Sequence, residues 1–167
     1  MNMNVYIGTY TRGSGGIHLL DMDPATGALT NKGLVAECVS PSFLTISRDG
    51  RYVFAVNETA DYSGAATGSV SAFARDSAAG KLTLLNVQSS NGSYPCHITV
   101  SRSGRHVIVA NYGSGTVAVL PVKPDGRLEP ASCVLQHRGS SVNKSRQEGP
   151  HSHSVNFDPA NRFALAC

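Results

Sequence analysis

The strongest constraint on the fold of this chain is a short segment that occurs three times. RYVFAVN at residues 51–57 recurs as RHVIVAN at residues 105–111, and RFALAC at residues 162–167 begins the same pattern again. The leading arginines Arg51, Arg105 and Arg162 are 54 and 57 residues apart. Self-similarity at such a period is typical of stacked supersecondary units rather than of one irregular core. The sequence therefore predicts a repeat protein.

Each unit is predicted to contain four short strands. In the most complete unit they are residues 44–47, 52–57, 68–73 and 82–87. The first and third alternate apolar and polar residues, whereas the second is almost continuously apolar, as expected for a strand covered on both faces. Turns rich in Asp, Pro and Gly separate the strands. Across the units, Gly16, Gly68 and Gly115 are matched at the start of the third strand.

Four antiparallel strands in about 50 residues, repeated without any helical period, are typical of a β-propeller blade. A sandwich of unrelated hairpins is the all-β alternative, but it does not explain the matched spacings. Residues 1–167 hold about three four-stranded blades, and propellers close with about 4 to 8. We therefore expect the N-terminal part of one propeller domain, truncated in mid-blade, with the remaining blades in the same protein. A short propeller assembled from several chains is the alternative.

Composition excludes several classes of protein. With 41% hydrophobic and 15% charged residues and 17 glycines, the chain is globular and turn-rich rather than disordered. No signal peptide and no membrane span is predicted. The four cysteines lack paired metal-ligand spacing, which favours reduced thiols in a cytoplasmic protein. A net charge of +3 and the absence of Trp argue against a nucleic-acid partner.

The irregular loops are all predicted to lie on one face of the propeller. In an up-and-down blade, the loops from second to third strand share a face with the crossovers between blades. The long segments of this chain belong to that set: residues 9–15, 57–68, 89–95, 111–115 and 136–152. Loops longer than a connection requires usually carry function. The functional site is therefore expected on this face.

The longest loop ends in a histidine-rich segment at residues 146–154. The repeat places His153 where Ser42 and Cys96 stand, at the start of the innermost strand and hence at the mouth of the central channel. An imidazole titrates near neutral pH and can act as a general base. Capping of the strand through backbone hydrogen bonds is the alternative role for the histidines. Without a third ligand the pair predicts no metal site. The catalytic candidates are His153, His151 and Glu148.

Polar residues near this segment are candidates for substrate binding. Arg138, Lys144 and Arg146 fall within nine residues of the same loop, a cluster that suits a phosphate ester. A solvated surface loop is the alternative. Asn57 and Asn111 end equivalent strands and either donate hydrogen bonds to a ligand or fasten the loops. The repeat aligns His97 with Ser154 and Phe43, whose side chains point to the other side of the strand from that of His153. This position predicts a packing role for His97.

Several motifs resemble the bacterial seven-bladed propeller lactonase family, which includes propeller-type 6-phosphogluconolactonases and is related to a fungal carboxy-muconate cyclase. They are YIGTYT with GGIH, the unit at residues 41–58, the unit at residues 95–115 and QEGPHSHSVNFDP at residues 147–159. The resemblance implies a cytoplasmic enzyme of seven blades without a cofactor. It implies hydrolysis of 6-phospho-D-glucono-1,5-lactone to 6-phosphogluconate in the pentose phosphate pathway. His153 matches a histidine that, in the cyclase branch, opens an inner strand and works with groups from later blades.

The position of His153 in the repeat and the family resemblance together predict that His153 activates water for attack on the lactone carbonyl. His151 or a group from a missing blade would assist ring opening, while Arg146 with Lys144 or Arg138 holds the phosphate. The isolated chain is expected to be inactive, because half a channel does not enclose a site. A muconate-type cycloisomerase is one alternative. The other is a non-enzymatic binding platform, for which the loops offer Tyr10, Tyr62, Tyr94 and Tyr112.

Overall fold

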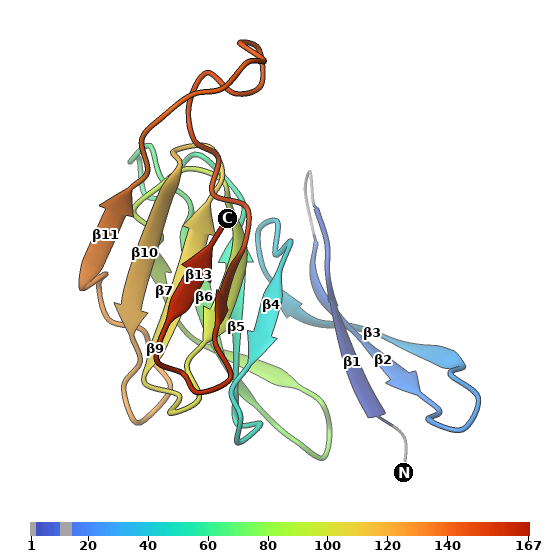
Figure 1. Ribbon diagram of the computed structural model, residues 1–167. Coiled ribbons are helices and arrows are strands. Elements are labelled where there is room, and N and C mark those ends of the chain that lie inside the picture. The colour runs from blue at the N-terminus through green and yellow to red at the C-terminus, as the bar shows by residue number, and fades with distance from the viewer. Residues whose placement is uncertain (1–2, 11–14) are drawn as a thin grey trace.

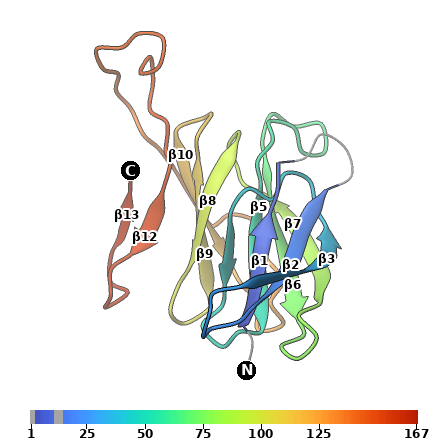
Figure 2. The same cartoon turned by 90° about the vertical axis from the view of Figure 1, so that its right-hand side faces the viewer.

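The computed structural model describes residues 3–10 and 15–167, so part of the predicted loop at residues 9–15 lies outside the described residues. Every regular element of the described part is a strand. The strands form four antiparallel sheets that follow one another in chain order (Figure 1, Figure 2). The predicted all-β propeller architecture is confirmed.

Two of the sheets are complete four-stranded blades and two are partial. The first sheet contains β1 (Met3–Gly8), β2 (Gly16–Met22) and β3 (Leu29–Glu37). The second contains β4 (Leu44–Ile46), β5 (Tyr52–Asn57), β6 (Ser69–Arg75) and β7 (Leu82–Ser89). The third contains β8 (Pro95–Val100), β9 (His106–Asn111), β10 (Thr116–Pro121) and β11 (Cys133–Gln136). The last pairs β12 (Val155–Phe157) with β13 (Ala164–Ala166).

The hydrogen-bonded residue pairs of successive sheets are separated by the same number of residues as the copies of the sequence repeat. Equivalent pairs bond the first strand to the second in three sheets: Leu44 with Ala55, Ile98 with Val109, and Val155 with Ala166. The first strands β4, β8 and β12 contact one another in succession. They are therefore the innermost strands of their sheets, as the repeat predicted.

Apolar cores lie between successive sheets rather than within one of them. Phe54 and Val56 of β5 pack against the third sheet, whereas Val53 and Ala55 of the same strand pack against the first. All four are fully buried. Burial of such side chains contributes roughly 1.5–3 kcal/mol each for the larger ones. The continuous apolar run that predicted a doubly covered strand thus holds neighbouring blades together.

The first sheet corrects the sequence alignment by one residue. Ile17 belongs to the core shared by the first two sheets. Val70 and Val117 occupy the equivalent positions in the next two cores. The strand partner of Ile17 is Gly8, whereas Val70 and Val117 pair with Val56 and Ala110. Consequently, Gly15 rather than Gly16 is equivalent to Gly68 and Gly115. The shift makes Tyr10 the counterpart of Glu58 and Tyr112, one residue beyond the matched asparagines.

The two ends of the sheets differ, as the loop lengths predicted. Short turns join the first strand to the second at one end, where Gly50 and Gly104 both have φ of 72° and Asn161 of the next copy has φ of 57°. Glycine and asparagine tolerate this left-handed conformation. At the other end, the segment between β11 and β12 extends well beyond the sheets (Figure 1, Figure 2). We call the first the turn face and the second the loop face.

Within residues 3–10 and 15–167, no helix is long and apolar enough to cross a membrane.

Candidate functional site

His153 lies on the loop face, two residues before β12, and is exposed. Its backbone N–H donates to the carbonyl oxygen of Cys167 at 2.7 Å, which fixes the residue at the start of the inner strand. The imidazole meets the edge of the Tyr112 ring, with centroids 5.7 Å apart. Among the described residues, neither ring nitrogen of His153 has a hydrogen-bond partner. The imidazole is therefore free to act on a ligand.

Tyr112 connects His153 to the rest of the histidine-rich loop. The His151 ring stacks on it with centroids 4.5 Å apart, and His151 Nδ1 lies 3.0 Å from the Tyr112 carbonyl oxygen. Since a carbonyl oxygen only accepts, this nitrogen carries the proton. Arg146 Nη2 donates to the Tyr112 hydroxyl at 3.1 Å. His151 thus has the backbone contact that the capping alternative predicted.

Glu148 approaches the other nitrogen of His151. Its Oε1 lies 3.4 Å from Nε2, which is an ion pair only when the ring is protonated. The Glu148 side chain is largely exposed, with 60% of its surface open to solvent. Glu148 contacts His151, and the catalytic role predicted for Glu148 stays a prediction.

The loop borders an open hollow with a volume of about 620 Å³. Arg138 and Arg146 both line it, together with Tyr112 and His151. Lys144 belongs to the same loop and is exposed, but it does not line the hollow. The structure thus brings together two of the three predicted cations, beside the aromatic ring that contacts His153.

Asn57 and Asn111 are buried, and neither lines this hollow. The Asn57 side chain donates to Cys38 Sγ at 3.2 Å and accepts from the Ser71 hydroxyl at 2.8 Å. The Asn111 amide donates to the carbonyl of Ser90 and to Thr116 Oγ1, both at 3.0 Å. Of their two predicted roles, the contacts correspond to fastening the loops. Substrate binding by these residues stays a prediction.

His97 packs between blades, as its position predicted. Its ring lies 4.0 Å from that of Phe43, and its Nδ1 accepts from the Val155 N–H at 3.3 Å. Burial, assisted by the nearby His153, lowers the pKa of His97. The neutral ring that accepts this bond is therefore the favoured form.

A second polar group surrounds Glu58, the residue that follows β5. Glu58 Oε2 accepts a hydrogen bond from the Tyr10 hydroxyl at 2.8 Å and another from the Ser42 hydroxyl. The hydrogen bond to Glu58 and partial burial raise the pKa of Tyr10. Burial and then the charge of Glu58 raise the pKa of Cys96 to about 11. Cys96 is thus a neutral thiol at neutral pH, unsuited to act as a nucleophile.

The contacts around His153 and those around Glu58 involve equivalent positions of the repeat. In each case the residue just beyond the second strand of one blade lies near the first inner-strand residue of the next. Tyr112 meets His153 in this way, and Glu58 lies close enough to Cys96 to shift its pKa. The pattern extends to Tyr10, which interacts with Ser42. Matched positions of successive blades therefore lie next to one another on the loop face.

Glu58 was not among the candidate residues predicted from the sequence. The available signal was its position directly after Asn57, matched by Tyr112 after Asn111. That signal did not show that Tyr10 and Ser42 would both donate to one carboxylate oxygen. For metals, no cluster of three or more His, Cys, Asp or Glu side chains occurs within residues 3–10 and 15–167.

Comparison with known proteins identifies the family of the chain. The family described as lactonase, 7-bladed beta-propeller matches residues 4–167. A 6-phosphogluconolactonase of Bacillus subtilis is 35% identical over 162 residues, covering 96% of this chain and 45% of the relative. One from Formosa agariphila is 30% identical, covering 95% of this chain and 45% of the relative.

Solved structures show the same architecture. A Bacteroides fragilis protein superposes with a TM-score of 0.90 at 38% identity, covering 99% of this chain and 45% of the other. A periplasmic gluconolactonase of Pseudomonas aeruginosa superposes with a TM-score of 0.89 at 34% identity, covering 99% and 47%. The chain spans about half the length of the curated relatives it matches. On the match over residues 4–167, the chain belongs to the seven-bladed β-propeller lactonase family.

Proposed function

We propose that the protein hydrolyses 6-phospho-D-glucono-1,5-lactone to 6-phosphogluconate, a step of the pentose phosphate pathway. The observation that carries the proposal is the free imidazole of His153, which Tyr112 joins to a hollow lined by Arg138 and Arg146. This combination offers a base beside an anion-binding surface. The relatives named 6-phosphogluconolactonase support the choice of substrate.

In the proposed mechanism, His153 removes a proton from water as the water oxygen attacks the lactone carbonyl. The tetrahedral intermediate then collapses, the bond from the carbonyl carbon to the ring oxygen breaks, and the ring oxygen takes up the proton. His151 stays in place against Tyr112 and keeps that ring in contact with His153. Donors on the remaining blades are expected to stabilise the oxyanion.

Arg146 and Arg138 hold the phosphate in this proposal. Guanidinium groups match phosphate oxygens through paired hydrogen bonds, which places the sugar relative to the base. The bond from Arg146 to the Tyr112 hydroxyl fixes one of these groups beside the ring that His153 contacts. Lys144 contributes charge on the same loop without lining the hollow.

Further blades of the same protein are part of the proposal. Met3 and Ile7 of β1, at one end of the stack, and Phe163 and Leu165, at the other, each expose more than 40% of their surface. Additional blades on both sides would cover these apolar residues. A cytoplasmic location is also proposed, since Cys38, Cys96, Cys133 and Cys167 are all free thiols. The Pseudomonas aeruginosa relative is described as periplasmic.

Glu58 is proposed as a second functional group at the mouth. Its carboxylate accepts from Tyr10 and Ser42, and the Glu58→Gln substitution keeps the size of the side chain while removing the charge. We expect the substitution to lower kcat about tenfold or more, because bonds to a charged group contribute more than neutral ones. Steady-state kinetics on the full-length protein measure this effect. The matched control is Glu129→Gln, whose carboxylate pairs with Lys123. Equal kcat values for the two variants would contradict a role for Glu58.

The proposed function is tested by hydrolysis assays on the full-length protein with the phosphorylated sugar lactone and with muconolactone. We expect turnover of the sugar lactone and none of muconolactone. Conversion of muconolactone alone, to its isomer muconate without uptake of water, would indicate a cycloisomerase instead. Turnover of neither would contradict an enzymatic role and favour the binding platform.

A further inference from the structure

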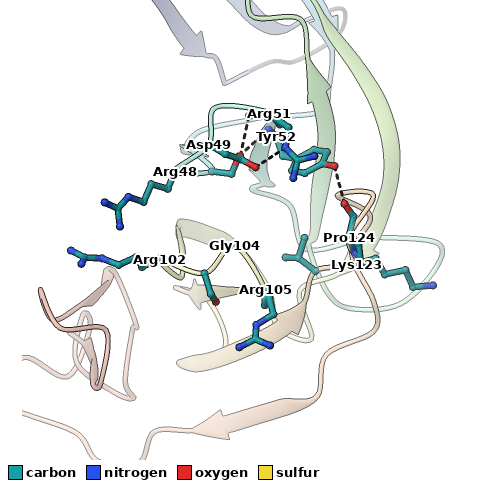
Figure 3. Close-up of a pocket in the computed structure, with 12 residues that line it drawn as sticks. Arg48, Asp49, Arg51, Tyr52, Arg102, Gly104, Arg105, Lys123 and Pro124 are labelled. Atoms are coloured by element: carbon teal, nitrogen blue, oxygen red, sulfur yellow. Dashed lines mark hydrogen bonds and ion pairs between the residues drawn. The ribbon is translucent and has the colours of Figure 1, made fainter.

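A second basic hollow lies on the turn face, at the opposite end of the sheets from His153. Its volume is about 620 Å³, and it lies between the first turns of the second and third sheets and the segment that follows β10. Five cationic side chains line it, and Figure 3 shows most of them around one space. They are Arg48, Arg51, Arg102, Arg105 and Lys123.

The repeat itself produces this concentration of charge. Arg48 and Arg102 occupy the same position in successive copies, 54 residues apart, and so do Arg51 and Arg105. Because equivalent turns of neighbouring blades lie side by side, one arginine pair per turn becomes a group of four. Figure 3 shows Arg48 and Arg102 extending toward the same side of the hollow.

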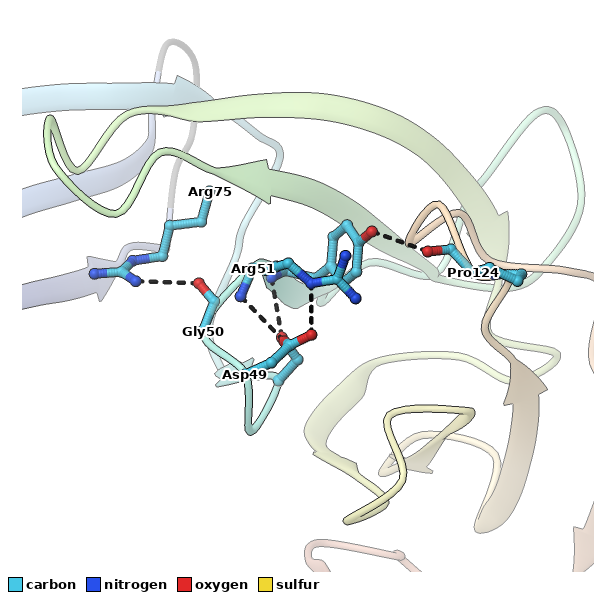
Figure 4. A network of polar contacts seen from close by, with 7 residues as sticks. Asp49, Gly50, Arg51, Arg75 and Pro124 are labelled. Carbon is cyan, nitrogen blue, oxygen red and sulfur yellow. Dashed lines mark hydrogen bonds and ion pairs between the residues drawn. The ribbon is translucent and has the colours of Figure 1, made fainter.

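Three of these guanidinium groups have no protein partner among the described residues: Arg48, Arg102 and Arg105. The one carboxylate that lines the hollow, Asp49, is already occupied. It accepts from the Ser47 hydroxyl at 2.6 Å, from the Arg51 backbone N–H at 3.1 Å and from Arg51 Nε at 2.6 Å (Figure 4). Asp49 therefore balances Arg51 alone, and in the described part of the chain the other guanidinium groups of the hollow have no anion beside them.

The floor of the hollow is held in place by contacts between blades. The Tyr52 hydroxyl donates to the Pro124 carbonyl at 3.0 Å, a bond that joins the second sheet to the third (Figure 4). A Cβ at Gly126 would lie 2.3 Å from the Tyr52 ring, so the two segments are in close contact there. Arg51 lies over the same ring, 5.1 Å from its centroid. A fixed floor reduces the entropy lost when a ligand binds.

We propose that the turn-face hollow binds a small molecule that carries a phosphate group, at a site separate from the proposed lactone site. Unpaired guanidinium groups recognise phosphate through paired hydrogen bonds. The volume lies in the range of small-molecule sites, roughly 300–1,000 Å³, which favours a metabolite over a polymer. The site does not depend on the proposed hydrolysis.

Isothermal titration calorimetry with pyrophosphate as the probe tests this proposal on the full-length protein. The double variant Arg48→Ala/Arg102→Ala should bind pyrophosphate at least roughly tenfold more weakly than the unmodified protein, since each bond to a charged group is worth about that much. Arg102→Lys should show a smaller loss, because lysine keeps the charge but not the planar fork. Both positions, Arg48 and Arg102, are exposed turn residues, so the fold should tolerate the changes.

Two controls separate this site from other cationic surfaces. Arg162→Ala removes the equivalent of Arg105 from the next copy, where Asp158 already pairs with it at 3.7 Å, and it should leave the affinity unchanged. Arg146→Ala removes a cation from the loop face and should leave the turn-face site intact. Equal affinity of the double variant and the unmodified protein would overturn the proposal. So would tighter binding of single-stranded DNA that displaces pyrophosphate, because it would indicate a polymer surface.

Discussion

The substitution His153→Gln should lower kcat for lactone hydrolysis at least about 100-fold, since positioned acid–base groups typically contribute factors of 10² to 10⁴. Glutamine fills similar space and keeps the backbone bond to Cys167, but it cannot take a proton from water. Because the side chain is exposed, the free energy of unfolding should change by less than about 0.5 kcal/mol. Initial rates and denaturant unfolding on the full-length protein measure the two quantities.

The matched control is His106→Gln. His106 is likewise exposed but opens β9 at the turn face, away from the mouth. We expect its kcat to match that of the unmodified protein. If His153→Gln retained full turnover, His153 would not be the base, and the capping role through its backbone would be all that the residue supplies.

The substitution Phe54→Ala should have the largest effect on stability, lowering the free energy of unfolding by about 3–5 kcal/mol. Phe54 is fully buried in the core shared by the second and third sheets. Truncation leaves a cavity at a contact between blades, where neighbouring β-sheets cannot collapse to fill it. Chemical denaturation monitored by circular dichroism measures the loss.

Leu84→Ala serves as the control for this prediction. Leu84 lies on the outer strand β7 with 54% of its surface exposed, so its loss should cost less than about 0.5 kcal/mol. A cost below about 1 kcal/mol for Phe54→Ala would show that the blades are not held by this core. A graded loss in Phe54→Leu, smaller than that in the alanine variant, would support it.

The blade pattern was predictable because it depends on local chemistry that repeats. Alternation of apolar and polar residues indicated strands buried on one face, and the apolar run of β5 indicated a strand buried on both faces. Gly50 and Gly104 lie in equivalent turns. The first blade was misaligned by one residue because consecutive glycines carry no side-chain pattern. Only the packing of Ile17 against the second sheet resolved that register.

The site was less predictable because it depends on contacts between blades. His153 stood out where the repeat changes, and the structure places it at the start of its inner strand. Glu58 did not stand out, since its two donors lie 16 and 48 residues away in the sequence. The conformation of the long loop has no period to constrain it, so the separation of Lys144 from the hollow could not be predicted. The burial of Asn57 and Asn111 likewise depends on loops that fold over them.

The proposed substrate is tested most directly by comparing hydrolysis of the 6-phosphorylated gluconolactone with that of unphosphorylated gluconolactone by the full-length protein, each corrected for spontaneous opening. Binding of the phosphate by Arg138 and Arg146 predicts a kcat/KM at least roughly tenfold higher for the phosphorylated lactone. Rates no greater than spontaneous opening for both lactones, from folded protein, would contradict the proposed activity. Equal kcat/KM values for the two would contradict the proposed phosphate site.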